Sequence, residues 1–229
     1  MGTITSTTVL DKAAILLFDT NNVKWARSEL LGYLNDGQRA IVAVIPEANS
    51  VTQNLTLVAG SRQTLPTGAN MLLEITRNMG ATGTTPGRML KLVDRAVLNE
   101  SNPAWQSDPT ATTTTLYMYN LRDRYAFYVY PQATAGQMLE AVLSMIPTDI
   151  VEPAVISISD IFQPALLDYI LWRAYSKDAP YASANKAAPY FQSFTMFLQA
   201  NAADSSKIAQ SMGQLMPPTP QQQGSVPGG

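Results

Sequence analysis

The sequence contains neither cysteine nor histidine, so any catalytic chemistry would rest on carboxylates, lysine, tyrosine or an oxygen-ligated metal. Thiolate nucleophiles, imidazole bases, disulfides and Cys/His zinc sites are thereby excluded. Glycoside cleavage needs only two carboxylates, but the candidate glutamates stand at no suggestive spacing. We interpret them as solvated surface charges. They are Glu47, Glu74, Glu100, Glu140 and Glu152.

Metal and phosphate sites have little support in the sequence. Asp11, Asp19 and Asp36 lack the alternating acids, central glycine and final glutamate of an EF-hand loop. Segment 81–87 has the glycines of a phosphate loop, but neither the Gly-Lys-Thr ending nor a following helix. We therefore expect no metal and no cofactor, and segment 81–87 is predicted to be a flexible hairpin connection.

An aromatic cluster is a candidate stacking surface for single-stranded nucleic acid. Its residues alternate along two predicted strands, and the turn between them supplies the cations Arg122 and Arg124. Paired aromatics across a hairpin are also ordinary sheet stabilisers, and the net charge of −2 leaves no basic footprint. We therefore favour the structural interpretation. The cluster comprises Tyr117, Tyr119, Phe127, Tyr128 and Tyr130.

The composition favours contact with other proteins over contact with water or lipid. Charged residues make up 14% of the 229 residues and hydrophobic residues 46%, against a typical charged fraction of about a quarter. Residues 1–8 resemble no signal peptide, and no apolar run approaches the ~20 residues that span a bilayer. We expect a soluble protein made in a cytosol, with protein interfaces and no membrane contact.

Periodicity predicts helices at both ends of the chain and strands between them. Helices are expected from Thr8 through Asp19 and over 27–45, where Leu30, Leu34 and Ile41 lie on the apolar stripe and Asn35 mainly outside it. Pro46 ends the second helix. Strands are expected over 51–59, 71–77, 89–94, from 113, around 127–130 and over 138–144, with a short helical turn capped by Asp94.

The two C-terminal helices, 160–178 and 181–202, dominate the prediction. Asp160 and Gln163 form a capping-box pattern at the start of the first helix. That helix is apolar on almost every side, so it must be enclosed by the rest of the chain or by neighbouring copies. Its two charges, Asp168 and Arg173, are expected to be paired, because a lone buried charge costs several kcal/mol.

The predicted fold class is α+β, with a discontinuous helical bundle made from the N-terminal and C-terminal helix pairs. Residues 1–48 and 158–210 would form the bundle, and 49–157 a β-rich insertion of antiparallel strands. Residues 211–229 are rich in Pro, Gln and Gly, so they are predicted to form an extended, flexible arm.

The segment order over residues 25–198 resembles that of phage head-to-tail adaptor (connector) proteins. The segments that carry the resemblance are fold-bearing rather than catalytic, and they are specific as a set. They are Trp25, Glu29-Leu30-Leu31 and Tyr33-Leu34-Asn35-Asp36-Gly37-Gln38-Arg39; Arg62-Gln63-Thr64-Leu65-Pro66; Arg77-Asn78-Met79-Gly80; Leu92-Val93-Asp94-Arg95; Phe127-Tyr128-Val129-Tyr130-Pro131; Leu166-Leu167-Asp168-Tyr169; and Arg173-Ala174-Tyr175-Ser176-Lys177-Asp178.

This resemblance implies a structural protein without catalytic activity, located in the virion neck and assembled in the host cytoplasm. Adaptors of this family form a dodecameric ring that binds the portal protein, extends the DNA channel used in genome ejection, and carries the downstream tail or nozzle protein. Double-stranded DNA would pass through without sequence-specific binding. The alternatives are a stopper or tail terminator, a carboxylate-dependent cell-wall glycosidase, and a single-stranded DNA-binding module.

Two interfaces follow as expectations, and the free chain is expected to be a monomer. The turn formed by Leu121, Arg122, Asp123 and Arg124 is expected to contact a neighbouring subunit or the next tail component. The arm is expected to bind the portal, through Leu215, Met216, Pro217, Pro218, Pro220 and Val226.

Overall fold

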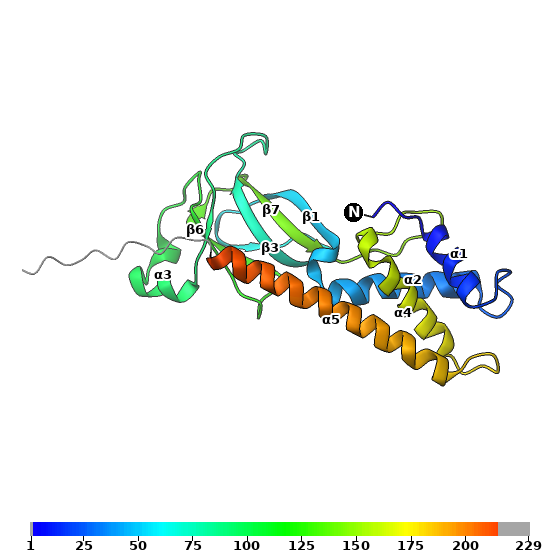
Figure 1. Ribbon diagram of the computed structural model, residues 1–229. Helices are drawn as coiled ribbons and strands as arrows, with labels where there is room; N and C mark the ends of the chain where they lie inside the picture. Colours follow the sequence, from blue (N-terminus) through cyan, green and yellow to red (C-terminus); the bar gives the residue numbers. More distant parts are fainter. Residues whose placement is uncertain (1, 215–229) are drawn as a thin grey trace, which may run out of the picture.

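The computed structural model describes residues 2–214, with side chains described as far as residue 203. The fold is α+β, as predicted (Figure 1). The helical elements are α1 (Ser6–Leu16), α2 (Arg27–Val44), η1 (Pro46–Asn49), α3 (Arg95–Ser101), η2 (Trp105–Ser107), η3 (Asp160–Phe162), α4 (Gln163–Tyr175) and α5 (Ala184–Gln214). The strands are β1 (Ser50–Thr56), β2 (Gly60–Thr64), β3 (Ala69–Asn78), β4 (Lys91–Leu92), β5 (Leu116–Tyr119), β6 (Ala126–Ala133) and β7 (Met138–Met145).

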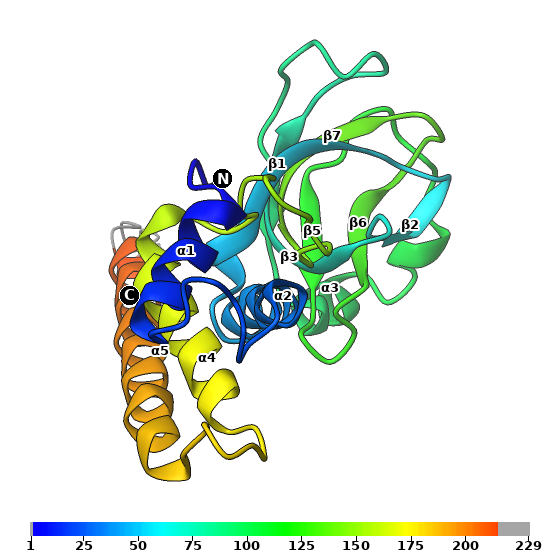
Figure 2. The ribbon, with the colours of Figure 1, turned by 90° about the vertical axis from the view of Figure 1, so that its right-hand side faces the viewer.

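Helix α4 lies at the centre of the bundle, with α1, α2 and α5 of the same chain packed against it (Figure 2). The apolar sides of α4 are therefore covered by helices of the same chain, without a second copy. The resulting core also includes residues that precede α4, such as Ile156 and Ile158. Fully buried members of this core include Val9, Leu10, Leu34, Ile41, Leu166 and Ile170.

Helices α2 and α4 run antiparallel, and the segments that carry the family resemblance meet along this contact. The indole Nε1 of Trp25 donates to the Ala174 carbonyl oxygen at 3.1 Å. Two further contacts repeat the pairing along the helices. Glu29 pairs with Lys177 at 2.9 Å, and the Arg173 guanidinium lies over the Tyr33 ring at 5.5 Å.

The two charged residues of α4, Asp168 and Arg173, do not pair with each other and have separate partners. Asp168 is half-buried and accepts a hydrogen bond from the Ser193 hydroxyl at 2.6 Å. Burial raises the pKa of this carboxyl, and the Ser193 hydrogen bond opposes the rise. Arg173 is exposed and stacks on Tyr33 and Trp172. Both charges have partners, as expected, but Arg173 is not buried.

The segment 146–158, which returns the chain from β7 to α4, is bound by polar side chains of α2. Asn35 donates to the Ile150 carbonyl oxygen and accepts from the Ile150 amide, both at 3.1 Å. The Gln38 side-chain oxygen accepts from the Ser157 amide at 2.7 Å. The prediction that Asn35 lies mainly outside the buried face is wrong, because Asn35 is buried where its side chain binds the backbone of Ile150.

Two sheets form the β module. Strands β1, β7 and β3 make one sheet in that order, and β2, β6, β5 and β4 make the other. All strand pairs are antiparallel except β4 with β5. Strand β2 was not predicted, and β4 is two residues long rather than six as predicted. The sheets share an apolar core, with Leu72, Ile75, Phe127, Val129, Leu139 and Leu143 fully or almost fully buried.

The capping box predicted at Asp160 is wrong. Residues 160–162 form a 3-10 turn, and α4 begins at Gln163 without a side-chain cap. The Asp160 carboxylate instead accepts hydrogen bonds from the Thr3 hydroxyl at 2.6 Å and the Thr3 amide at 2.8 Å. These donors hold its pKa below the usual value. An N-terminal segment distant in sequence therefore competes successfully for this carboxylate.

The ends of two other helices also differ from the prediction. Helix α1 ends at Leu16, three residues before Asp19, because Phe18 adopts a positive φ of 54°. Helix α5 continues to Gln214, so the first residues of the predicted arm are helical. The rest of the arm, 215–229, lies outside the described residues, and so do the predicted portal-binding side chains.

A pair of glycine substitutions on α2 tests the α2–α4 packing. In Gly37→Ala the new Cβ would lie 2.7 Å from Leu166 Cδ1 and 3.0 Å from Tyr169 Cδ1, whereas at Gly32 nothing lies within 4 Å. We expect Gly32→Ala to stabilise the protein by up to ~1 kcal/mol through helix propensity, and Gly37→Ala to destabilise it by ~1–3 kcal/mol through overpacking. Urea unfolding measures both; equal stabilisation by the two variants would contradict the packing.

An ion pair between α2 and the return segment should make stability depend on pH. Arg27 donates to both carboxylate oxygens of Glu152, at 3.1 and 3.0 Å through Nε, and this holds the pKa of Glu152 below its usual value. The ion pair therefore contributes to the free energy of unfolding above pH ~4.3, the pKa of Glu in the unfolded chain. This contribution is lost as the pH falls through the lower pKa of Glu152 in the folded protein.

We therefore expect Glu152→Gln to cost ~1–3 kcal/mol at pH 7, where a charge-assisted hydrogen bond is lost. The cost should shrink towards pH 3, as measured by urea unfolding across that range. Glu47→Gln is the matched control, because Glu47 is exposed and forms no ion pair among the described residues. A Glu152→Gln penalty that stays constant with pH would argue against the assignment.

Candidate functional site

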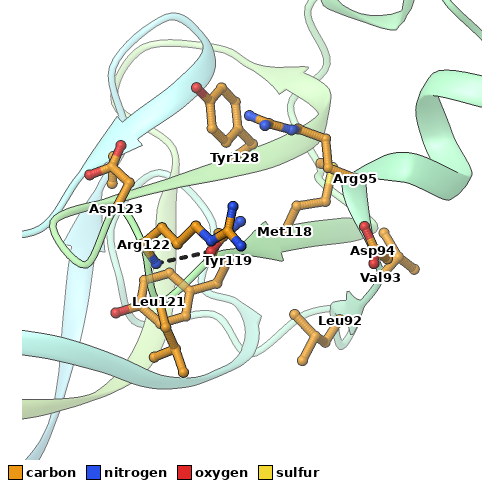
Figure 3. A pocket seen from close by; sticks show the side chains of 12 residues that line it. Leu92, Val93, Asp94, Arg95, Met118, Tyr119, Leu121, Arg122, Asp123 and Tyr128 are labelled. Atoms are coloured by element: carbon orange, nitrogen blue, oxygen red, sulfur yellow. Dashed lines mark hydrogen bonds between the residues drawn. The ribbon is translucent and has the colours of Figure 1, made fainter.

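The candidate site is an open pocket of about 830 Å³ on the β module, between the β5–β6 turn and the start of α3 (Figure 3). Strand β4 leads into α3 and pairs with β5, so the two walls of the pocket are tied together by backbone hydrogen bonds. The lining residues are Leu92, Val93, Asp94, Arg95, Met118, Tyr119, Asn120, Leu121, Arg122, Asp123, Ala126 and Tyr128.

The β5–β6 turn is shaped by Asn120. Its side-chain oxygen accepts from the Arg122 amide at 2.9 Å, and its carbonyl oxygen accepts from the Asp123 amide at 3.0 Å. Asparagine commonly organises turns in this way. Asp123 also faces Arg62 of β2 at 3.9 Å. The sequence predicted this turn correctly, whereas the contribution of β2 came from an unpredicted strand.

Tyr119 anchors the turn to the other sheet. Its hydroxyl donates to the Arg124 carbonyl oxygen at 3.0 Å and accepts from the Leu72 amide at 3.2 Å. Burial raises the pKa of Tyr119, and the hydrogen bond from Leu72 opposes the rise. The hydroxyl therefore stays protonated and keeps the turn in place over the β module.

Helix α3 forms the opposite wall. The Asp94 carboxylate accepts from the Ala96 amide at 2.8 Å and caps the helix, as predicted. The Arg95 guanidinium lies 5.3 Å from the centre of the Tyr128 ring. Trp105 is almost fully buried behind this wall and packs edge-on against Tyr128. The Trp105–Tyr128 pair therefore packs against both β6, which carries Tyr128, and α3, which carries Arg95.

The chemistry of the pocket suits docking rather than reaction. Its apolar floor and exposed rim residues such as Leu92, 58% exposed, and Leu121, 61% exposed, offer area for a protein segment. The Arg122 side chain reaches over the pocket and forms no ion pair or hydrogen bond among the described residues (Figure 3). Arg95 is engaged only by Tyr128 there. An apolar segment with a nearby carboxylate would complement these groups.

The glutamates considered for acid–base work do not form a reactive pair. Glu140 is bound by Arg77 at 2.8 Å and by Thr76 at 2.7 Å, and hydrogen bonds from these groups lower its pKa. Glu152 is paired with Arg27. The others, Glu47, Glu74 and Glu100, are exposed at separate places in the fold. A general acid needs a raised pKa, so these environments disfavour that role.

The aromatic cluster serves the sheet. Tyr117 and Phe127 are buried in the β core, and Tyr130 packs against Trp105 and donates to Asp108 at 2.8 Å. Within the described part of the chain, no group of three or more acidic residues could hold a metal ion. None of the helices described there is long and apolar enough to cross a membrane.

Sequence reasoning located the turn 121–124 but missed the wall that completes the pocket. A signal for the wall was present, because Asp94 was recognised as a helix cap immediately after a strand. What the sequence did not reveal is that β4 lies parallel beside β5, which brings α3 opposite the turn. The predicted portal-binding residues, from Leu215 to Val226, lie outside the described residues.

The described residues form a two-part helical bundle that carries a β module with an exposed pocket. The family model described as SU10 adaptor protein matches residues 4–218. The chain therefore belongs to this family of phage head-to-tail adaptor proteins. No curated protein matches the chain.

Tyr119→Phe tests how the turn is held. The variant leaves the amide of Leu72, a buried residue, without a partner, so we expect a loss of ~1–3 kcal/mol. Hydrogen exchange of the Arg122 and Asp123 amides should also accelerate. Tyr125→Phe is the control, because Tyr125 is 60% exposed. Unchanged exchange at the turn in Tyr119→Phe would show that other contacts hold it.

Proposed function

We propose that this phage structural protein works as a ring beneath the portal. Twelve copies would bind the portal protein, extend the DNA channel and provide the platform for the downstream tail or nozzle protein. The family match over residues 4–218 carries this proposal. The structure of the helical bundle supports it. The resemblance segments around α2 and α4 contact each other, so the residues typical of the family hold the bundle together rather than form a reaction centre.

The charge distribution supports passage of DNA without tight binding. The chain has 15 basic and 17 acidic residues, and several cations are neutralised within the chain. Arg27 pairs with Asp11 and Glu152, and Arg77 pairs with Glu140. Phosphate contacts would retain DNA. We propose that the channel wall is neutral to acidic and is formed by part of the helical bundle, which would let double-stranded DNA slide through.

The domain division follows the two apolar cores. We propose that residues 1–48 and 158–210 act as one bundle domain and 49–157 as the β insertion, with 211–229 as the arm. The bundle core and the β core have no residue in common. We propose that the arm binds the portal through the residues from Leu215 to Val226 named above, because its Pro-, Gln- and Gly-rich sequence is suited to an extended segment that binds a partner.

The pocket beside the turn 121–124 is the proposed contact with a neighbouring subunit or the next tail component. A heterologous contact of this kind closes into a ring when the rotation between copies allows it. Docking at this place is supported by the exposed apolar rim and by the Arg122 guanidinium, which has no ion pair or hydrogen bond within the described part of the chain. Assembly is proposed to occur in the host cytoplasm, and the site of action is the virion neck.

The alternatives receive less support. A stopper or tail terminator would be expected to lack the two-part helical bundle, which is present in this chain. A glycosidase is disfavoured because Glu140 and Glu152 are engaged by arginines. A nucleic-acid stacking platform is disfavoured because Tyr117 and Phe127 are buried.

Native mass spectrometry with the purified portal tests the proposal. Alone, the chain should appear as a monomer of 24.8 kDa, and with the portal it should add as twelve copies. A chain truncated after Met212 should stay unbound, because the proposed arm is removed. Circular dichroism is the control for its folding. Twelve truncated copies on the portal would refute the arm assignment, and no binding of the full chain would refute the proposed function.

A further inference from the structure

Strand β1 is an edge strand whose outer side is not covered by another described strand. It pairs with β7 on one side only, as the first strand of the sheet β1-β7-β3, and runs along the near side of the β module in Figure 2. Its register with β7 is continuous from Ser50 to Thr56, without a bulge. We call the outer side of these seven residues the β1 edge. Such an edge exposes a row of backbone groups that can bind another strand.

The hydrogen bond that follows β1 shows which backbone groups face outwards. The Leu57 amide donates to the Gln137 carbonyl oxygen at 2.8 Å, so the backbone groups of Leu57 point towards β7. Because successive residues of a strand point alternately to its two sides, every second residue of β1 points away from β7. These residues are Ser50, Thr52, Asn54 and Thr56, and all four are exposed. Apart from the pairing with β7, their backbone groups have no hydrogen-bond partner among the described residues.

The other edge strands carry protections that β1 lacks. On β3, the Leu72 amide donates to the Tyr119 hydroxyl at 3.2 Å. Strand β2 carries Arg62 and a register shift, and β4 is two residues long and carries Lys91. Charges, bulges and short length are the usual means of preventing edge pairing. Strand β1 contains no charged residue, no proline, no glycine and no bulge.

The β1 edge is complementary to a second copy of itself. We consider an antiparallel register centred on Gln53. Thr52 of one copy then lies opposite Asn54 of the other, and Ser50 lies opposite Thr56. Every outward-facing residue therefore meets an outward-facing residue, so the backbone groups of both edges can pair throughout. No like charges meet across the pair, because β1 is uncharged.

We propose that two copies of the free chain pair through the β1 edge about a two-fold axis. The product is one six-stranded sheet in the order β3-β7-β1-β1-β7-β3. A two-fold contact closes with two copies, so this association is separate from the proposed twelve-copy ring. A contact one strand wide buries less than the ~1,200 Å² typical of stable interfaces. The dimer is therefore weak, and the chain stays monomeric in the dilute solutions of native mass spectrometry.

Single cysteine substitutions test the register, because the chain contains no cysteine. In Gln53→Cys the two thiols would face each other at a non-hydrogen-bonded pair, whose Cα atoms lie ~4.5 Å apart, within the range for a disulfide. Thr56→Cys is the matched control, because in this register the two copies of residue 56 lie ~20 Å apart. After mild oxidation of concentrated protein, we expect about ten times more disulfide-linked dimer from Gln53→Cys than from Thr56→Cys on a non-reducing gel.

A proline at position 52 tests the backbone pairing. The Thr52 amide points away from β7, so Thr52→Pro removes a donor from the β1 edge and leaves the hydrogen bonds with β7 in place. We expect the melting temperature to stay close to that of the unsubstituted chain. The mass measured by light scattering in concentrated solution should fall from that of a dimer to that of a monomer. Thr52→Pro should also reduce the disulfide yield of Gln53→Cys about tenfold.

Each outcome decides the inference separately from the proposed function. Equal disulfide yields from Gln53→Cys and Thr56→Cys would overturn it, and so would a monomeric mass for the concentrated unsubstituted chain. A dimer that persists in Thr52→Pro would show that another surface pairs, which also overturns it. If Thr52→Pro unfolds, the comparison of the two cysteine variants still decides. The portal-ring function is tested independently by the native mass experiment with the portal.

Discussion

The structure depends on the hydrogen bonds by which α2 holds the return segment 146–158. Asn35 binds both backbone groups of Ile150, and Gln38 binds the Ser157 amide. These backbone groups are far from α2 in sequence and half-buried, so leaving them unpaired would cost on the order of 1 kcal/mol each. The hydrogen bonds from Asn35 and Gln38 fix where the chain re-enters the bundle. They thereby fix the position of α4 between the other helices.

With α4 enclosed by its own chain, the surfaces left for assembly lie elsewhere. The proposed one is the pocket between the β5–β6 turn and α3, which combines exposed apolar rim residues with the Arg122 guanidinium. This pocket lies on the β module, outside the helical bundle that encloses α4.

The sparse charge of the chain is used mainly for internal organisation. Arg27 joins α2 to Asp11 of α1 and Glu152 of the return segment, and Lys177 joins the end of α4 to Glu29. These pairs orient elements rather than create a reactive centre, and exposed pairs of this kind contribute little stability individually.

The sequence by itself determined the helix and strand periods, the α+β class, the turn 121–124 and the Asp94 cap, because each depends on neighbours within a few residues. The resemblance segments were also readable, including those of α2 and α4 that bind each other. Tertiary structure decided the rest. A carboxylate or amide binds the groups that the fold brings nearest. Asp160 therefore accepts hydrogen bonds from Thr3 instead of capping α4, Asn35 is buried where it binds the backbone of Ile150, and Asp19 accepts from the amides of Val23, Lys24 and Trp25. The pairing of β4 with β5, which builds the pocket, likewise depends on contacts that no local pattern records.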